Sequence, residues 1–458
     1  DDYSITDVGN SWYRLTMTFS TDGSSFSSES QRIGVSDGTT GITSGYFLIT
    51  ANGTDGFYVW GAQVEQRSSA TAYTATTTAP IVKYQPVLQT AASGEARFDH
   101  DPVTGESKGL LIEEARTNLL DYSEDFSQSY WNKPNLDIVS NTIIAPDGTL
   151  TGTKVIATAV ETYHQLDRFS AHPIGSSEFT ASVFLKAGET TKVRFMLVPT
   201  TPNDFSNHSY ANIDLSTGVI LSTLRANASI KDVGNGWYRC TVTSTQVTSS
   251  SSTDVQVAFS FVNDAATSVN ITGDGYSGFY IWGAQVEEAS FPTSYIPTSG
   301  STVTRAVDTV SIDSSNLSSF LQQGSGTIYT EFSAYNTSTT SVYAFELAKG
   351  NGSHVYLRQN TSSAFDSAVQ FNGTSVAYRS ILSGTVTNGT LNKTVVAYDE
   401  NSHILAAEGT LSAEDTSVQV DEFTELWIGT SYGGGTHRIN GHLNKLAYYP
   451  KRLPNATL

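Results

Sequence analysis

Apolar and polar residues alternate along much of this chain, in short runs separated by turn-forming residues. At residues 237–243, Tyr238, Cys240 and Val242 face one way and the residues between them, Trp237 included, face the other, because successive side chains of a strand point to opposite faces. We expect the tyrosine-containing face to be the core. No long window shows apolar residues at the i, i+3, i+4 spacing of a helix. The pattern predicts an all-β chain of tandem antiparallel β-sandwich (jelly-roll) domains.

The strands are clearest in the middle of the chain. The last of them, with the sequence Gly-Phe-Tyr-Ile-Trp-Gly-Ala, is apolar on both faces and is therefore expected in the middle of a sheet rather than at its edge. Turn pairs such as Asp147-Gly148 separate the runs, as in hairpins. The expected strands cover residues 179–185, 193–197, 237–243, 255–261 and 278–286.

Two segments of the chain occur twice with nearly identical sequences. Residues 7–14, Asp-Val-Gly-Asn-Ser-Trp-Tyr-Arg, return at 232–239 with one change, and residues 56–65 return at 278–287. Both intervals exceed 200 residues, far more than the period of a solenoid. The repeats therefore predict two copies of one domain, in which Trp12, Trp60, Trp237 and Trp282 serve packing.

The first copy is incomplete, because nothing in residues 1–80 corresponds to residues 118–226. Half of a sandwich exposes its inner face and its strand edges to water. We expect the natural chain to extend upstream of Asp1 and supply the missing strands; the alternative is a neighbouring chain.

The length of 458 residues suits about three domains. We predict the end of a first sandwich at residues 1–80, a connecting segment with a short strand at 81–117, a complete second sandwich at 118–300 and a third unit at 301–458. The apolar triple Leu110-Leu111-Ile112 supplies the connecting strand and fixes the angle between domains. In the third unit we expect strands at residues 326–332, 342–347, 354–358, 393–398, 425–429 and 443–449.

Charge and composition exclude some ligands. The formal net charge of −19 repels phosphate backbones, so nucleic acid is not expected as a partner. No run of about 18 apolar residues exists, so membrane insertion is not expected. The single cysteine, Cys240, corresponds to Leu15 of the first copy and is predicted to be a small core residue.

Two stretches resemble known families. Residues 109–120 (Gly-Leu-Leu-Ile-Glu-Glu-Ala-Arg-Thr-Asn-Leu-Leu), Ser-Glu-Asp-Phe at 123–126 and Trp131 resemble the start of the carbohydrate-binding-like β-sandwich domains of bacteriophage tail-fibre, spike and head-fibre proteins. Residues 280–287 and Pro-Thr-Ser-Tyr-Ile-Pro at 292–297 resemble the close of that module. Residues 303–458 are similar to a concanavalin A-like (laminin G-like) lectin domain, through the segments at 326–332, 395–399, 426–429 and 439–450.

These resemblances imply a non-enzymatic protein of the virion surface, and thus an extracellular one, that displays lectin-like modules. The implied partners are host-surface polysaccharide and other virion proteins, and weak sites gain avidity in a homo-oligomer, with a trimer favoured. Two alternatives stay open. One is a structural spacer or capsid decoration protein that binds no glycan, and the other is the non-catalytic part of a polysaccharide depolymerase.

Sugar rings stack on exposed aromatic faces, so the candidate binding residues are aromatic or histidine side chains near turns. Each has an alternative role in edge packing or hairpin geometry. The candidates are Trp131 with its neighbour Tyr130, Tyr163, Tyr432 and His437.

The chain shows no catalytic pair and no dedicated metal site. A retaining glycoside hydrolase needs two carboxylates about 5 to 5.5 Å apart, and the acidic cluster at residues 421–425 lacks the alternating pattern that supplies them. We therefore expect no enzymatic activity and no cofactor. Asp99-His100-Asp101 and the turn at 270–274 offer oxygen ligands for Ca²⁺ without the spacing of a calcium loop.

Overall fold

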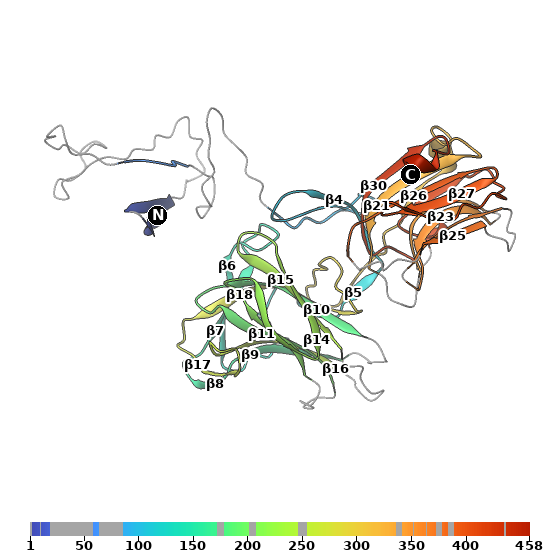
Figure 1. The fold of residues 1–458 in the computed structure, drawn as a ribbon. Coiled ribbons are helices and arrows are strands. Elements are labelled where there is room, and N and C mark those ends of the chain that lie inside the picture. Colours follow the sequence, from blue (N-terminus) through green and yellow to red (C-terminus); the bar gives the residue numbers. More distant parts are fainter. Residues whose placement is uncertain are drawn as a thin grey trace, which may run out of the picture. The chain divides into compact units, whose positions relative to one another are not determined.

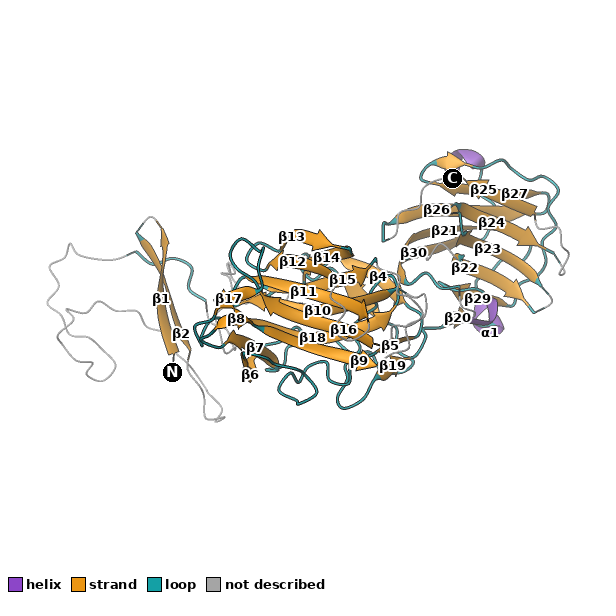
Figure 2. Ribbon diagram, turned by 90° about the horizontal axis from the view of Figure 1, so that it is seen from below, coloured by secondary structure: helices purple, strands orange, loops and turns teal. Residues whose placement is uncertain are grey.

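The chain is represented by a computed structural model that divides into two compact units, Asp1–Tyr84 and Gln85–Leu458. It describes residues 2–9, 11–18, 58–63, 86–171, 178–200, 208–245, 254–335, 341–350, 352–362, 364–371, 378–382, 389–434 and 437–458. Strands dominate the described residues and pair antiparallel into sheets (Figure 1, Figure 2). The prediction of an all-β chain of antiparallel sandwiches is confirmed.

The first unit contains a hairpin of β1 (Asp2–Gly9) and β2 (Trp12–Thr18). It repeats the pairing of β14 (Ala226–Asp232) with β15 (Trp237–Ser244) in the same register, since Asp7 lies opposite Tyr13 as Asp232 lies opposite Tyr238. The duplicated segment at 7–14 and 232–239 thus forms the same local structure twice.

The two copies differ in how their tryptophans are covered. Trp237 and Trp282 are buried, whereas Trp12 and Trp60 are 43% and 72% exposed. The packing role predicted for all four is therefore wrong for Trp12 and Trp60, because the described residues of the first unit contain no counterpart of β10, the strand that pairs with both β15 and β18. The strand expected at 56–65 is described only at 58–63, where no strand forms, and the rest of it lies outside the described residues.

The complete sandwich of residues 118–300 has two main sheets. The six-stranded sheet has the order β14-β15-β10-β18-β7-β6, and the five-stranded sheet has the order β13-β12-β11-β16-β9. All five strands predicted here are confirmed, and β18 lies between β10 and β7, as expected for a strand that is apolar on both faces. The remaining bounds are β6 Leu136–Ile143, β7 Gly152–Ala157, β9 Gln165–Ala171, β10 Phe179–Ala187, β11 Lys192–Thr200, β12 Ser209–Asp214, β13 Val219–Leu224, β16 Asp254–Phe261 and β18 Gly278–Glu288.

The main core of this sandwich lies between the two sheets and includes Cys240, whose predicted core position is confirmed. A second apolar cluster covers the outer face of the six-stranded sheet, where Phe184, Trp237 and Trp282 are buried together. The alternation therefore predicted the faces correctly, but Trp237 is buried as well, because both faces of β15 are covered. Two short pairs complete this region, β8 (Glu161–Tyr163) with β17 (Asn270–Thr272) and β5 (Arg116–Asn118) with β19 (Val303–Arg305).

The C-terminal sandwich also has two main sheets around one core. The six-stranded sheet, in the order β20-β29-β22-β23-β24-β25, contains β20 Val310–Ile312, β22 Val342–Lys349, β23 Ser353–Gln359, β24 Phe365–Gln370, β25 Tyr378–Leu382 and β29 Glu425–Ile428. The seven-stranded sheet, in the order β28-β27-β26-β21-β30-β4-β3, contains β3 Phe98–His100, β4 Ser107–Ile112, β21 Gly326–Ser333, β26 Asn392–Asp399, β27 Ser402–Ala407, β28 Thr410–Leu411 and β30 Gly441–Tyr449. The helical segments are α1 Ser314–Leu317, η2 Tyr432–Gly434 and η3 Asn455–Thr457.

Strands β3 and β4 come from the segment that we expected to connect two domains. Instead of a connecting strand, β4 is a member of the C-terminal sheet, beside β30 (Figure 1). Leu110 lies opposite Leu443, and Ile112 lies opposite Gly441. Ile112 is fully buried in the C-terminal core. The sandwich of residues 118–300 is therefore inserted between β4 and the rest of the C-terminal sandwich.

Gly109 permits this pairing. Its φ of +86° lies in the left-handed region, and a Cβ at this position would lie 2.2 Å from the carbonyl oxygen of Leu443. Only glycine allows the backbone of β4 to approach β30 so closely.

A buried ion-pair network holds the point where the inserted sandwich begins and ends. The Glu113 carboxylate accepts hydrogen bonds from Arg97 Nη1 at 2.8 Å, Arg305 Nη1 at 2.5 Å and both the amide and the hydroxyl of Ser294, at 2.8 and 2.7 Å. Arg97 also pairs with Asp308. The network therefore links β4, the inserted sandwich and the chain that follows it.

Candidate functional site

The outer face of the six-stranded C-terminal sheet carries a cluster of aromatic and charged side chains. Alternation along β23 sends Val355 and Leu357 into the core, so His354, Tyr356 and Arg358 point outward. We call the set of Tyr343, Glu346, His354, Tyr356, Arg358, Trp427, Tyr432 and His437 the aromatic face.

A β-bulge brings two of these side chains to one face. Tyr343 and Glu346 are three residues apart on β22, which strict alternation would place on opposite faces. The register of β22 on β23 shifts between Tyr343 and Phe345, so one extra residue is accommodated there. Tyr343 then lies opposite Arg358, and Glu346 opposite Tyr356.

Arg358 organises one half of the aromatic face. Its guanidinium carbon lies 5.6 Å from the ring centre of Tyr343 and 5.0 Å from that of Tyr356, and these two rings are 5.3 Å apart. Its Nε donates to Asp366 Oδ2 at 2.8 Å, and its Nη1 donates to the Tyr343 hydroxyl at 3.0 Å. Because that hydroxyl accepts from Arg358, its own hydrogen is left to donate elsewhere.

The electrostatics keep this half in one protonation state at neutral pH. Burial opposes the charge of Arg358, but the two tyrosines and Asp366 outweigh burial and raise the pKa of the guanidinium. Burial also raises the pKa of the Tyr343 hydroxyl, although Arg358 opposes that shift. A cation and a neutral phenol therefore stand side by side.

Glu346 organises the other half. One carboxylate oxygen lies 2.6 Å from His354 Nδ1, and the other accepts the backbone N–H of Tyr432 at 2.7 Å. The centre of the Tyr432 ring lies 6.0 Å from that of His354 and 5.9 Å from that of Trp427, in a T-shaped arrangement in both cases. Trp427 Nε1 donates to Glu425 at 2.8 Å. Buried Glu346 thus fixes the loop that carries the exposed Tyr432.

The aromatic face suits a ligand that presents both C–H and O–H groups. Partly exposed ring faces offer apolar contact, and the tyrosine hydroxyls, guanidinium and imidazoles beside them offer hydrogen bonds. The two buried carboxylates beside these rings, Glu346 and Asp366, are already engaged by the Tyr432 N–H and by Arg358. Half-buried Glu425 accepts from Trp427 Nε1.

Two of the residues predicted from sequence lie on this face. Tyr432 is 38% exposed on η2, and the ring of His437 lies 5.8 Å from that of Tyr343 while its Nδ1 is 3.0 Å from the Ser341 carbonyl oxygen. The structure brings them together with Tyr343, Tyr356 and Trp427, which sequence reasoning missed. Strand alternation could have found His354, Tyr356 and Arg358, but not the bulge that adds Tyr343.

Trp131 is wrongly placed by the sequence prediction. It is 2% exposed, its ring packs on Phe126 at 5.0 Å and Phe259 at 6.4 Å, and its Nε1 donates to the Tyr122 carbonyl at 3.2 Å. It is a core residue of the inserted sandwich, because the segment after β5 folds back between the two sheets. It cannot present a ring face to a sugar.

Tyr130 and Tyr163 lie apart from the aromatic face, on the inserted sandwich. Tyr130 is half-buried, with the Arg168 guanidinium carbon 3.9 Å from its ring centre and its hydroxyl accepting from the Asp121 N–H. Tyr163 is 46% exposed at the end of β8. Neither is tested as a binding residue, and both stay predictions.

The oxygen ligands proposed for calcium have other partners. Asp99 accepts from His442 Nε2 at 2.9 Å and lies 3.7 Å from Lys108 Nζ, and Asp101 accepts the N–H groups of Val103 and Thr104. In the turn at 270–274, Asp274 accepts from the following backbone. Among the described residues, no group of three or more acidic, histidine or cysteine side chains is arranged to hold a metal ion.

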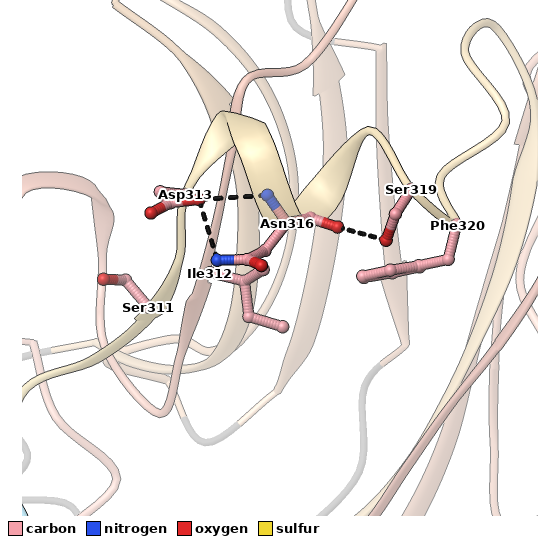
Figure 3. Close-up of a pocket in the computed structure, with 6 residues that line it drawn as sticks. All are labelled: Ser311, Ile312, Asp313, Asn316, Ser319 and Phe320. Atoms are coloured by element: carbon pink, nitrogen blue, oxygen red, sulfur yellow. Dashed lines mark hydrogen bonds between the residues drawn. The ribbon is translucent and has the colours of Figure 1, made fainter.

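An open pocket beside α1 is a weaker candidate. It is lined by Ser311, Ile312, Asp313, Asn316, Ser319 and Phe320 (Figure 3). Asp313 accepts the backbone and side-chain N–H groups of Asn316, so its carboxylate caps the single helical turn. The polar groups of this pocket therefore serve the turn itself.

No helix within the described ranges is long and apolar enough to cross a bilayer.

The fold and site define an antiparallel β-sandwich protein with an aromatic and polar outer sheet face. No protein-family model matches the chain, and no curated protein matches it significantly. Among solved structures, it is similar to the carbohydrate-binding module CBM40 of the Ruminococcus gnavus IT-sialidase bound to α2,3-sialyllactose, with 16% identity, a TM-score of 0.28 and coverage of 33% of this chain and 94% of that one. It is also similar to the Limulus polyphemus SAP-like pentraxin, with 14% identity, a TM-score of 0.25 and coverage of 29% of this chain and 66% of that one. Mouse laminin α1 domains LG4-5 match with 9% identity, a TM-score of 0.25 and coverage of 81% of this chain and 93% of that one. Similarity at this level assigns neither a ligand nor an activity.

Proposed function

We propose that this protein is a non-enzymatic glycan-binding protein that contacts sugar rings through the aromatic face. The supporting observation is the row of rings held in fixed positions, with half-buried Tyr343 and largely buried Tyr356 around Arg358 and with half-buried Trp427 and exposed Tyr432 near Glu346. Pyranose C–H faces pack against such rings, while the hydroxyls bond to the polar groups between them.

The state of the two carboxylates favours binding over hydrolysis. Asp366 is fully buried and paired with Arg358, and Glu346 accepts the Tyr432 N–H and lies 2.6 Å from His354 Nδ1. A general acid or nucleophile must reach the glycosidic bond with a free oxygen. Glu346 and Asp366 instead position the aromatic side chains, and Glu425 accepts from the Trp427 indole.

The finer proposal is a fibre or spike protein on the surface of a phage-like particle, which binds host polysaccharide as an oligomer, with a trimer favoured. It rests on the sequence resemblance of residues 109–131 and 280–297, and repeated weak sites suit multivalent adhesion. A density map of the intact particle, together with the mass of the purified protein in solution, tests both parts.

The binding test uses the full chain on a glycan array and then titration calorimetry with the glycans that bind. The Tyr432→Ala variant removes an exposed ring without a core role and is expected to weaken binding about tenfold or more. Tyr449→Ala is the matched control, because Tyr449 is a similarly exposed tyrosine, 44%, on the opposite sheet of the same sandwich.

Binding lost equally in both variants, or unchanged in both, would reject the aromatic face as the site. No retention on any glycan or host cell would favour the structural spacer. Incubation with host capsule followed by a reducing-end assay tests the enzymatic alternative, and release of sugar ends would overturn the non-enzymatic proposal.

A further inference from the structure

The outer face of the five-stranded sheet in the inserted sandwich holds a second polar cluster. Along β11, Val193, Phe195 and Leu197 enter the core, so Arg194 points outward. Arg194 lies opposite Asn212 of β12 on one side and Ser260 of β16 on the other. It therefore occupies the central strand of the sheet.

The Arg194 side chain is held in place before any ligand arrives. Its Nε donates to Asn212 Oδ1 at 2.9 Å, and its guanidinium carbon lies 4.1 Å from the ring centre of Tyr210. Asn212 is itself fixed, because its Nδ2 donates to Ser222 Oγ at 3.0 Å and to the Ala266 carbonyl at 2.8 Å. The amide and the ring thus orient the guanidinium, and Asn212 engages its Nε.

Among the described residues, Arg194 has no acidic partner, unlike several other arginines of the chain. Arg97 pairs with Glu113, Arg358 with Asp366 and Arg452 with Glu414. Among the described residues, no aspartate or glutamate forms an ion pair with Arg194, and burial lowers the pKa of its guanidinium. A partly buried cation without a counter-ion is stabilised by any anion that reaches it.

We propose that Arg194 binds the carboxylate of an acidic saccharide, at a second ligand site separate from the aromatic face. The saccharide part of this inference rests on the proposed glycan-binding function. The guanidinium fork matches a planar carboxylate in a bidentate pair, and Tyr210 beside it offers a ring edge to the sugar.

The charge around the site selects a singly charged group. The neighbouring cation, Lys192, lies two residues along β11, and its Nζ donates to the Asp264 carbonyl oxygen at 2.7 Å. One uncompensated guanidinium balances one negative charge, whereas a phosphate dianion calls for a cluster of cations that the described residues around Arg194 do not supply.

The test titrates the full chain with tetragalacturonate and sialyllactose, and with their neutral counterparts, carboxyl-reduced tetragalactose and lactose. Arg194→Gln is expected to weaken binding of an acidic probe about tenfold or more while leaving the neutral probes unchanged. Arg194→Lys keeps the charge but loses the fork and is expected to recover only part of the affinity. Arg225→Gln, at an exposed arginine of the same sandwich, controls for loss of one positive charge.

The outcomes separate the two proposals. If the wild-type protein binds neither acidic probe more tightly than its neutral counterpart, or if Arg194→Gln and Arg225→Gln behave alike, the Arg194 site is rejected. The aromatic face is tested separately, by the difference in glycan affinity between Tyr432→Ala and Tyr449→Ala. Circular dichroism of each variant excludes loss of the fold as the cause.

Discussion

Replacing Glu113 with glutamine should destabilise the Gln85–Leu458 unit strongly. Glu113 is buried and receives four hydrogen bonds, two from arginines and two from Ser294. Glutamine keeps the shape of the side chain but removes its charge and turns an N–H₂ group toward hydrogen-bond donors. Arg305 then loses its acidic partner, while Arg97 retains only Asp308.

The magnitude follows from the burial of the pair. Removing one partner of a buried ion pair typically costs about 3 to 5 kcal/mol, because the other charge is left without compensation. Arg97 and Arg305 keep about a fifth of their side-chain surface exposed, 19% and 18%. Solvent screening therefore places the expected loss near the lower end, at about 3 kcal/mol.

Urea unfolding followed by tryptophan fluorescence measures the loss, and hydrogen exchange locates it. The amides of β4 that pair with β30 should exchange faster in Glu113→Gln. Glu106→Gln is the control, since Glu106 is exposed in the turn between β3 and β4. Equal unfolding midpoints for the two variants, with unchanged exchange in β4, would refute the stabilising role of the network.

The same network predicts a direction of pH dependence. Burial opposes ionisation of Glu113, but Arg305 and Arg97 outweigh it and hold the pKa of the carboxyl below its usual value. A carboxyl with a lowered folded-state pKa adds stability above its unfolded pKa, and that stability is lost as the pH falls through the folded-state pKa. Glu113→Gln should remove this part of the acid dependence.

Three further predictions concern buried side chains. Trp131→Ala should cost about 3 to 5 kcal/mol in the free energy of unfolding, and Trp131→Phe clearly less, whereas an unchanged urea midpoint in Trp131→Ala would contradict the core assignment. Cys240 is fully buried, and burial raises the pKa of its thiol, so a thiol reagent should modify it only after denaturation. His403 lies between Ser367 and Ser380, and burial lowers its pKa to about 4. Because the unfolded chain takes up a proton near pH 6.5 and the folded chain does not, the free energy of unfolding should fall by about 3 kcal/mol as the pH drops from 6.5 to 4. A pH series of urea unfolding should show a smaller loss over this range in His403→Gln than in the wild-type chain.

The strands of the two sandwiches follow from local sequence. Alternation at Tyr238, Cys240 and Val242 identifies β15 and its core face, and an apolar run on both faces identifies β18 as a central strand. These features depend only on the two-residue period of a strand and on burial. Both features can therefore be read from residues that are adjacent in the sequence.

Features that depend on distant residues could not be predicted in this way. The pairing of β4 with β30 joins residues more than 300 positions apart. The apolar residues 110–112 predict a strand and Gly109 a close backbone approach, but neither identifies β30 as the partner. The aromatic face depends on a bulge at Tyr343, which alternation does not reveal. Trp131 is predicted from the sequence to be an exposed binding residue because it lies near turn residues. The local sequence does not show that the two sheets of the inserted sandwich cover its ring.

The insertion has a consequence for how the C-terminal sandwich folds. Pairing β4 with β30 closes a loop of more than 300 residues that contains the whole inserted sandwich, and about 190 of them lie between Glu113 and Arg305. The added length of the insert costs roughly 0.8 kcal/mol of chain entropy on closure. A folded insert removes most of that cost, because β5 pairs with β19 and so brings Arg116 opposite Arg305. Glu113 and Arg305 then meet beside this pair. The ion-pair network therefore stabilises the same closure that the folded insert prepares, so the inserted sandwich should form before β4 joins its sheet.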